Sequence, residues 1–256
     1  MNFLPLVLFA SSVLILHGGG LRAVDAKPGG VPRIETLRFK VNTSEAFEPF
    51  IENAYLVVDS EHHGALLIDP GSQDDQIDAY LSNNGIKLGA ILNTHGHMDH
   101  TAGNEHYARA FKVKVYAHAL DRPMILTDPA LMVFLDQEGP VTLGGFRLTV
   151  IHVPGHTPGS VAYLLSGALF TGDTLFRDGI GAAWGRTKAQ QDDSIQQELH
   201  GIRNKLLTLP GDTAVHPGHG EATSISRERT SHAFLKPGAL PHSTAPSKLM
   251  PPTEKK

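Results

Sequence analysis

One ten-residue segment, residues 94–103, constrains this chain more than any other feature of its sequence. It reads THGHMDHTAG and places four candidate metal ligands within six positions, namely His95, His97, Asp99 and His100. This H-x-H-x-D-H spacing is that of a ligand set rather than of unrelated histidines in a polar loop. The segment therefore predicts a metal site, and the fold must present these side chains together.

The surroundings of this segment indicate where it lies in the fold. The apolar run 90–92 before it is typical of a strand, and a helical pattern follows it. Functional loops of α/β proteins gather at the carboxyl ends of strands. Gly96 separates the first two histidines and lets the backbone turn tightly, so both imidazoles can point at one ion.

Three further candidate ligands lie in turns that follow later strand-like runs. His156 lies in the turn 153–159 and Asp173 in the turn 170–175, while His216 and His219 share the turn 216–220, where either can be the ligand. Glycine or proline next to each candidate permits unusual backbone geometry and close approach to an ion. One histidine in such a turn is usually a surface residue, but four strand-end sites in one chain predict a shared centre.

The composition limits what this centre can contain. The 256 residues include 15 histidines and no cysteine, so imidazole, carboxylate and water must hold the metal. Charged residues make up 19% of the chain and the formal net charge is −4, which does not favour nucleic acid as a partner. The 41% of hydrophobic residues is enough for one sizeable core.

The middle of the chain alternates between strand-like and helix-like segments. Helical spacing of apolar residues predicts helices over 74–84, 103–111, 194–207 and 224–234. Runs rich in valine, isoleucine, leucine and aromatic residues predict strands over 34–40, 54–58, 65–68, 89–93, 113–117, 146–152, 160–165, 168–171 and 213–215. We therefore expect an α/β fold with sheets at the centre and helices outside.

The two ends of the chain differ from the middle. Residues 1–26 contain an apolar run of signal-peptide length and small residues before a cut after Ala26, which predicts export to the periplasm or beyond. No lysine or arginine precedes the run, so an uncleaved short anchor or a buried first helix is the alternative. Residues 236–256 are rich in proline, serine and lysine and predict a flexible tail. Residues 31–235 then form the folded domain, with no stable membrane insertion after signal removal.

The chain resembles the metallo-β-lactamase-fold hydrolases, and within them the glyoxalase II-like (hydroxyacylglutathione hydrolase-like) branch. The resemblance covers residues 34 to 235, nearly the whole folded span. The segments that carry it are ENAYLV (52–57), LIDPG (67–71), THGHMDH (94–100), PGHTPG (154–159), TGDTLF (171–176) and PGHG (217–220).

The resemblance implies an αβ/βα four-layer sandwich with the site along one edge of the two sheets. It implies three groups of ligands: His95, His97 and His156 for a first metal, Asp99, His100 and His219 for a second, and Asp173 as the bridging carboxylate. It thereby selects His219 over His216. Asp69 matches a buried acid that can orient a ligand.

This assignment predicts a hydrolytic mechanism with two metal ions. A hydroxide held between them attacks a carbonyl carbon, and Asp99 orients the hydroxide or accepts its proton. The nitrogen and oxygen ligands suit zinc, iron or manganese, and we expect two zinc ions. No G-x-S-x-G segment supplies a serine nucleophile.

The expected substrate is a small molecule, a thioester or related activated carboxyl ester. Glutathione-specific relatives carry a C-terminal helical domain, whereas here a short helix and the proline-rich tail follow His219, which puts glutathione recognition in doubt. Trp184 and the apolar stretch 124–134 are candidates for the wall of an acyl pocket, or for core residues. The alternatives are β-lactam hydrolysis, iron-dependent persulfide oxidation using the first-metal ligands, and a non-catalytic metal-binding scaffold.

Overall fold

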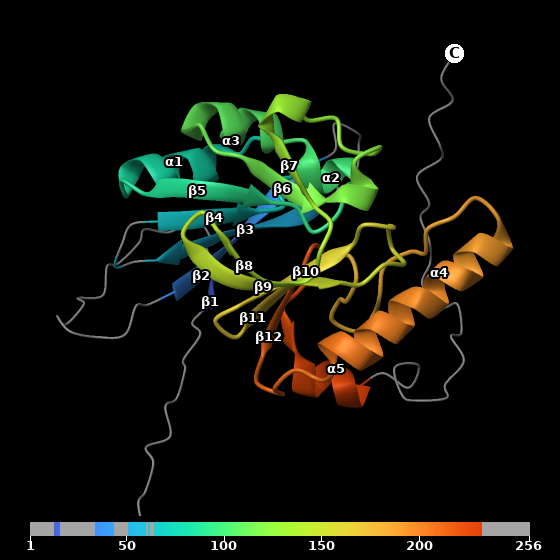
Figure 1. Ribbon diagram of the computed structural model, residues 1–256. Helices are drawn as coiled ribbons and strands as arrows, with labels where there is room; N and C mark the ends of the chain where they lie inside the picture. Colours follow the sequence, from blue (N-terminus) through green and yellow to red (C-terminus); the bar gives the residue numbers. More distant parts are fainter. Residues whose placement is uncertain (1–12, 16–33, 44–50, 60, 62–63, 232–256) are drawn as a thin grey trace, which may run out of the picture.

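Two β-sheets packed face to face form the centre of the computed structural model, which describes residues 13–15, 34–43, 51–59, 61 and 64–231 (Figure 1). The first sheet has the strand order β1-β2-β3-β4-β5-β6-β7, and the second has the order β13-β12-β11-β10-β9-β8. The strands of the first sheet are β1 (Val13–Ile15), β2 (Ile34–Asn42), β3 (Ile51–Asp59), β4 (Gly64–Ile68), β5 (Lys87–Leu92), β6 (Val115–His118) and β7 (Met132–Leu135). Those of the second are β8 (Gly139–Leu143), β9 (Phe146–His152), β10 (Val161–Leu165), β11 (Ala168–Gly172), β12 (Ala214–Pro217) and β13 (Thr223–Ser224).

The strand directions place several loops at one edge of the two sheets. Strands β4, β5, β6 and β7 run parallel, while β2, β3 and β4 are antiparallel neighbours. In the second sheet β11 and β12 run parallel and the other pairs are antiparallel. The carboxyl ends of β5, β11 and β12 each lead into one of the candidate ligand segments.

Helices cover both outer faces of the pair of sheets (Figure 1). On the first sheet lie α1 (Asp75–Asn83) and α3 (Asn104–Phe111), and on the second lie α4 (Lys188–Gly201) and α5 (Ile225–Ser231). A single helical turn, α2 (Met98–Thr101), carries part of the candidate site. The remaining short helices are the 3-10 turns Ala119–Asp121 and Pro129–Leu131 and the π-helical turn Ile202–Leu206, which continues α4.

Three layers of buried side chains hold these elements together. The central layer joins the facing sheets and includes Tyr55 and Ile68 from the first and Tyr163 and Phe170 from the second. The two outer layers pack the helices on the sheets. Burying this apolar surface is the main stabilising contribution, at roughly 25 cal/mol per Å². The expected αβ/βα four-layer sandwich is therefore confirmed.

Local sequence signals explain where the two longest helices begin. Asp74 caps α1, because its Oδ1 accepts hydrogen bonds from the backbone N–H groups of Gln76 and Ile77. Thr187 and Gln190 form a capping box at the start of α4. Helix α4 therefore starts six residues before the predicted position at residue 194, in a polar stretch that lacks an apolar stripe.

The chain ends fall largely outside the described residues. Strand β1 lies within the predicted signal peptide and pairs in parallel with β2, so a cut after Ala26 would remove it and leave β2 at the sheet edge. The predicted tail 236–256 lies outside the described residues. Among the residues that are described, no helix is long and apolar enough to cross a membrane.

Candidate metal centre

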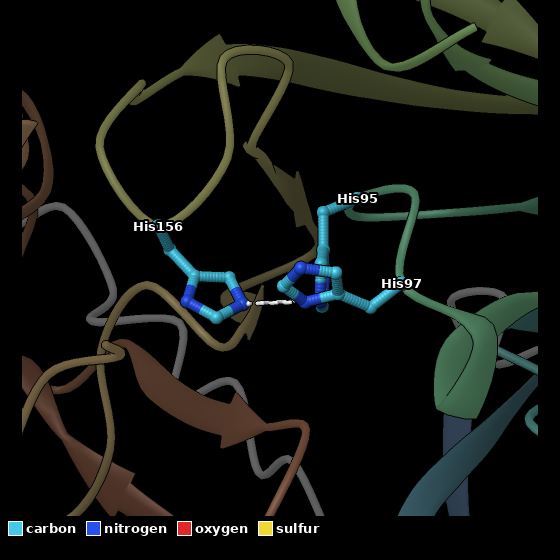
Figure 2. A group of neighbouring side chains, drawn as sticks. All are labelled: His95, His97 and His156. Carbon is cyan, nitrogen blue, oxygen red and sulfur yellow. Dashed lines mark hydrogen bonds between the residues drawn. The ribbon is translucent and has the colours of Figure 1, made fainter. Parts of the chain in front are cut away.

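Three histidine rings meet where a loop of the first sheet faces a loop of the second. His95 and His97 follow β5, and His156 follows β9. Figure 2 shows the three rings pointing toward one another. The Nε2 atom of His95 lies 3.0 Å from Nδ1 of His97 and 3.2 Å from Nε2 of His156, and the latter two nitrogens are 3.0 Å apart.

This triangle of nitrogens has close to the size that a tetrahedral ion requires. Bonds of about 2.0–2.1 Å from zinc to nitrogen at tetrahedral angles separate two ligand nitrogens by about 3.3 Å. Hydrogen bonds among the three nitrogens cannot pair all of them, because a ring nitrogen of a neutral imidazole is either a donor or an acceptor. At least two of the three nitrogens therefore have the same role and cannot bond to each other. A bound cation facing all three lone pairs satisfies it.

The opposite nitrogens of two of these rings have partners that fix the ring orientation. The Nδ1 atom of His156 lies 2.9 Å from the carbonyl oxygen of Ala182, and Nδ1 of His95 lies 3.1 Å from Oγ1 of Thr94. That hydroxyl in turn donates to Asp69 at 2.6 Å. Metal-binding histidines characteristically donate their second N–H in this way, which directs the free lone pair at the ion.

A second group of ligand atoms lies beside the first. Asp99 and His100 belong to α2, and His219 follows β12. The Nε2 atom of His219 lies 3.2 Å from Oδ2 of Asp99, and Nε2 of His100 lies 3.6 Å from the same oxygen. The Nδ1 atom of His219 lies 2.7 Å from the carbonyl oxygen of Ile51. A backbone carbonyl group therefore orients this ring, as another does for His156.

The carboxylate of Asp173 lies between the two groups. Its Oδ1 is 3.3 Å from Nε2 of His100, and its Oδ2 is 3.6 Å from Nε2 of His156 and 3.7 Å from Nε2 of His219. One carboxylate thus faces a histidine of each group, which is the arrangement that a bridging ligand needs.

Gly172 lets the strand end that carries Asp173 approach the loop of the first sheet. Its φ is +49°, and a Cβ atom there would lie 2.1 Å from Oγ1 of Thr94. Its carbonyl oxygen also accepts a hydrogen bond from the N–H of Gly218 at 2.9 Å, next to His219. A larger residue at this position would separate the two halves of the centre.

Two buried polar atoms at the centre favour a bound cation. Nε2 of His100 and Oδ1 of Asp173 have no hydrogen bond within the described part of the chain, although they lie 3.3 Å apart. Leaving such groups unpaired costs roughly 1–3 kcal/mol each. Nitrogen and carboxylate donors facing one space fit divalent ions such as zinc, iron and manganese.

Burial keeps His95 and His97 of the first histidine group neutral. It lowers the pKa of His95 well below its ordinary value, and it lowers the pKa of His97 to about 4. The neighbouring histidines act in the same direction as burial. Neutral imidazoles at neutral pH present lone pairs for a metal ion.

In the second group, attraction between opposite charges outweighs burial in setting the pKa values of the side chains. Burial acts to lower the pKa of His100, but Asp173 and Asp69 outweigh it and raise that pKa well above its ordinary value. Burial acts to raise the pKa of Asp173, but His100 outweighs it and holds the pKa well below the usual range. The hydrogen bond with Asp99 likewise raises the pKa of His219 against the effect of burial.

Two carboxyl groups lie behind His100. Asp69 accepts hydrogen bonds from the backbone N–H of Thr94 at 2.7 Å and from its hydroxyl at 2.6 Å, and Asp69 Oδ2 lies 3.2 Å from Nδ1 of His100. From this position Asp69 can orient the ring of His100, and its role stays a prediction. Glu52, which the sequence indicated only as part of a family segment, is fully buried with Oε1 3.7 Å from the same nitrogen, and burial raises its pKa well above the usual range.

His216 lies away from the centre. It is buried in the core, where its ring stacks on Phe170 at 5.1 Å and meets the edge of Tyr55 at 5.3 Å. The turn 216–220 therefore contributes His219 to the centre rather than His216.

The two candidates for an acyl-pocket wall lie in different places. The Trp184 ring is partly exposed and lies 6.4 Å from the ring of His97. Much of the stretch 124–134 packs in the outer core of the first sheet instead, through Ile125, Leu131 and Phe134. Those three side chains pack against the core, as the alternative interpretation expected.

A buried carboxylate that sequence reasoning missed is Asp121, at the end of the 3-10 turn after β6. It accepts hydrogen bonds from the N–H groups of Gly96 and Gly159, which belong to two different ligand loops. Its only signal in the sequence is its place just after a predicted strand, where the other site residues also lie.

Comparison with known proteins places this geometry in a family. Residues 47–219 match the model of the metallo-beta-lactamase superfamily. A hydroxyacylglutathione hydrolase of Synechococcus is 39% identical over 174 residues, which are 64% of this chain and 63% of that protein. The hydroxyacylglutathione hydrolase GloC of Haemophilus influenzae is 31% identical over 204 residues, which are 73% of this chain and 93% of that protein.

Solved structures show the same fold. The crystal structure of the BLEG-1 B3 metallo-beta-lactamase has a TM-score of 0.64 and 31% identity, covering 78% of this chain and 99% of that one. The di-iron-bound form of TTHA1623 has a TM-score of 0.60 and 34% identity, covering 77% and 99%. ETHE1 from Myxococcus xanthus has a TM-score of 0.56 and 29% identity, covering 70% and 77%. With the matched family model spanning most of the described domain, the chain belongs to the metallo-beta-lactamase superfamily, whose fold binds divalent metal ions.

Proposed function

We propose that this protein is a two-metal hydrolase of thioesters or related activated carboxyl esters. The observation that carries the proposal is the position of Asp173, within 3.3–3.7 Å of His100, His156 and His219. A carboxylate that reaches both histidine groups is the arrangement that two ions acting together need.

Each group of side chains has a distinct part in the proposed reaction. His95, His97 and His156 would hold the first ion, and Asp99, His100 and His219 the second. Ions bound there would supply a hydroxide at neutral pH and polarise a carbonyl oxygen. Asp99 is the proposed catalytic carboxylate, because its Oδ2 faces the centre beside His219 and can orient the attacking group or accept its proton.

The identity of the ions is part of the proposal. We propose two zinc ions, because three imidazole nitrogens suit zinc and leave its fourth coordination position open. Iron and manganese suit the same donors, and a di-iron form is known for TTHA1623.

Two observations support a small thioester with an apolar group as the substrate. Both relatives described above are named hydroxyacylglutathione hydrolases, and the match to GloC covers 93% of that protein. Three exposed large apolar residues also lie beside the centre: Ile51, whose carbonyl oxygen is 2.7 Å from Nδ1 of His219, Met98 in α2, and Trp184, whose ring is 6.4 Å from that of His97. Glutathione thioesters therefore belong in the substrate panel despite the doubt raised by the sequence.

Export is proposed on the sequence alone. The apolar run of residues 1–26 and the small residues before the cut after Ala26 carry it. Amino-terminal sequencing of the protein from the exported fraction tests it, and a chain that retains residues 1–26 would contradict it.

The substitution Asp173→Ala tests the hydrolase proposal. It removes the carboxylate between the ions, so kcat/KM for lactoylglutathione or a simple thioester should fall at least about 100-fold, since even outer partners of metal ligands contribute about 10- to 100-fold. The matched control is Asp192→Ala on the exposed side of α4, which should leave the rate unchanged. Rates near wild type for Asp173→Ala would refute the bridged mechanism.

A second candidate is β-lactam hydrolysis, which the 31% identity to the BLEG-1 lactamase favours. A chromogenic β-lactam assayed beside the thioesters and lactones separates the two, because the higher kcat/KM identifies the substrate class. Oxygen uptake with a persulfide and one iron per chain would instead contradict both hydrolytic functions.

A further inference from the structure

We propose that Asp121 is a positioning residue that sets the spacing of His95, His97 and His156 and thereby the affinity for the first metal ion. This inference rests on the metal assignment of the proposed function, but not on its substrate. The geometry of three hydrogen bonds carries it.

One carboxylate connects both loops that supply the first group of histidines. Oδ2 of Asp121 accepts from the N–H of Gly96 at 2.8 Å and from the hydroxyl of Thr157 at 2.7 Å, and Oδ1 accepts from the N–H of Gly159 at 2.7 Å. Gly96 stands between His95 and His97, and Thr157 follows His156 directly. The anchored groups are therefore adjacent in the chain to all three ligands.

The packing around this carboxylate leaves little freedom. Asp121 is fully buried, and a Cβ atom at Gly159 would lie 2.6 Å from its Cγ. A Cβ atom at Gly96 would lie 3.1 Å from Cβ of Asp121. Both loops approach the aspartate as closely as glycine permits, so their separation depends on this side chain.

The connection also crosses the interface between the sheets. Asp121 and Gly96 belong to loops of the first sheet, whereas Thr157 and Gly159 belong to the loop between β9 and β10 of the second. His95 and His97 are on one side of that interface and His156 on the other. Without the carboxylate, three buried donors lose a shared acceptor and the two loops lose their link.

The substitution Asp121→Asn tests the inference with little change in volume. The amide has one acceptor oxygen, so a buried N–H of Gly96 or Gly159 is left facing an NH₂ group in either orientation. The test measures cobalt or zinc affinity by competition with a chromophoric chelator in two full-length backgrounds. His219→Ala leaves the first group complete, and His97→Ala leaves the second group complete.

We expect Asp121→Asn to weaken metal binding about 10- to 100-fold in the His219→Ala background, as for other outer partners of metal ligands. In the His97→Ala background the change should be less than about threefold. A general loss of structure would weaken both sites alike, so equal losses would overturn the inference, as would an unchanged affinity in the first background.

Two further variants complete the design. Thr157→Val removes one of the three hydrogen bonds and should give a smaller loss in the same background. Asp128→Asn is the matched control, because Asp128 lies in the same segment and accepts from the N–H of Ala130 and from Arg109, away from the ligand loops.

The inference and the proposed function can fail separately. If the His219→Ala protein with Asp121 intact binds no metal, the metal assignment fails and the inference fails with it. If only thioester hydrolysis fails, the inference still stands.

Discussion

Asp69, like Asp121, is a buried carboxylate that accepts a backbone hydrogen bond from the segment 94–100. It accepts two hydrogen bonds from Thr94 and lies 3.2 Å from Nδ1 of His100. Through these contacts it orients the imidazole of His100 and fixes the start of the ligand loop. We propose that it holds His100 in place directly, and His95 more weakly through Thr94.

This role predicts the effect of Asp69→Asn. The amide can accept from Thr94 but places an NH₂ group against the other donors, so the second metal ion should bind about 10- to 100-fold more weakly. A metal titration in the His97→Ala background measures this. The control Asp128→Asn should change nothing, and an unaltered affinity for Asp69→Asn would show that His100 is oriented without it.

Sequence reasoning finds side chains whose neighbours are close in the chain. Four of the seven candidate ligands lie between residues 95 and 100, and glycine-containing turns indicate His156, Asp173 and His219. Asp121 carries no comparable signal, because its partners lie 25 to 38 positions away. Such a contact depends on how two sheets pack, which no local pattern encodes.

At the scale of elements, strand β12 and the turn after it place one histidine in the core and another at the candidate metal centre. His216 is buried in the strand while His219 follows it in the turn. Burial, with a smaller effect of Arg38, lowers the pKa of His216 from 6.5 to about 4. Between these values the unfolded chain binds a proton that the folded chain excludes.

The free energy of unfolding should therefore rise with pH across the window from about 4 to 6.5. The contribution of His216 is complete above about 6.5 and is lost as the pH falls toward 4, a change of up to about 3 kcal/mol at 1.36 kcal/mol per pKa unit. Urea unfolding of the metal-free protein at several pH values measures this slope. His216→Leu should make the free energy of unfolding less dependent on pH in this window. An equal dependence in both proteins would show that His216 is not held neutral by the fold.

Edge strands show what the sequence could not predict about the elements. The interior strands follow from their apolar runs, whereas β1, β7, β8 and β13 were missed, and each lies at the edge of its sheet. Strand β8 contains Pro140 and alternates partly buried with exposed residues before the buried Leu143, so its apolar signal is weak. Helix α4 was predicted too short because its first turns depend on the capping box of Thr187 rather than on an apolar face.

At the scale of the whole molecule, the candidate centre joins the two sheets. The first sheet supplies His95, His97, Asp99 and His100, and the second supplies His156, Asp173 and His219. The fold class follows from the order of elements and from the family segments. The closeness of the two ligand groups comes from the packed sheets and from Gly172, where a Cβ would meet Thr94.

Elemental analysis of the purified full-length protein, counting ions per chain, tests the central claim most directly. The two ligand groups and the carboxylate between them predict close to two divalent ions per chain. The substitution His219→Ala, which removes one ligand of the second group, should reduce this to close to one. A wild-type protein that binds a single ion under saturating metal would contradict the two-metal centre.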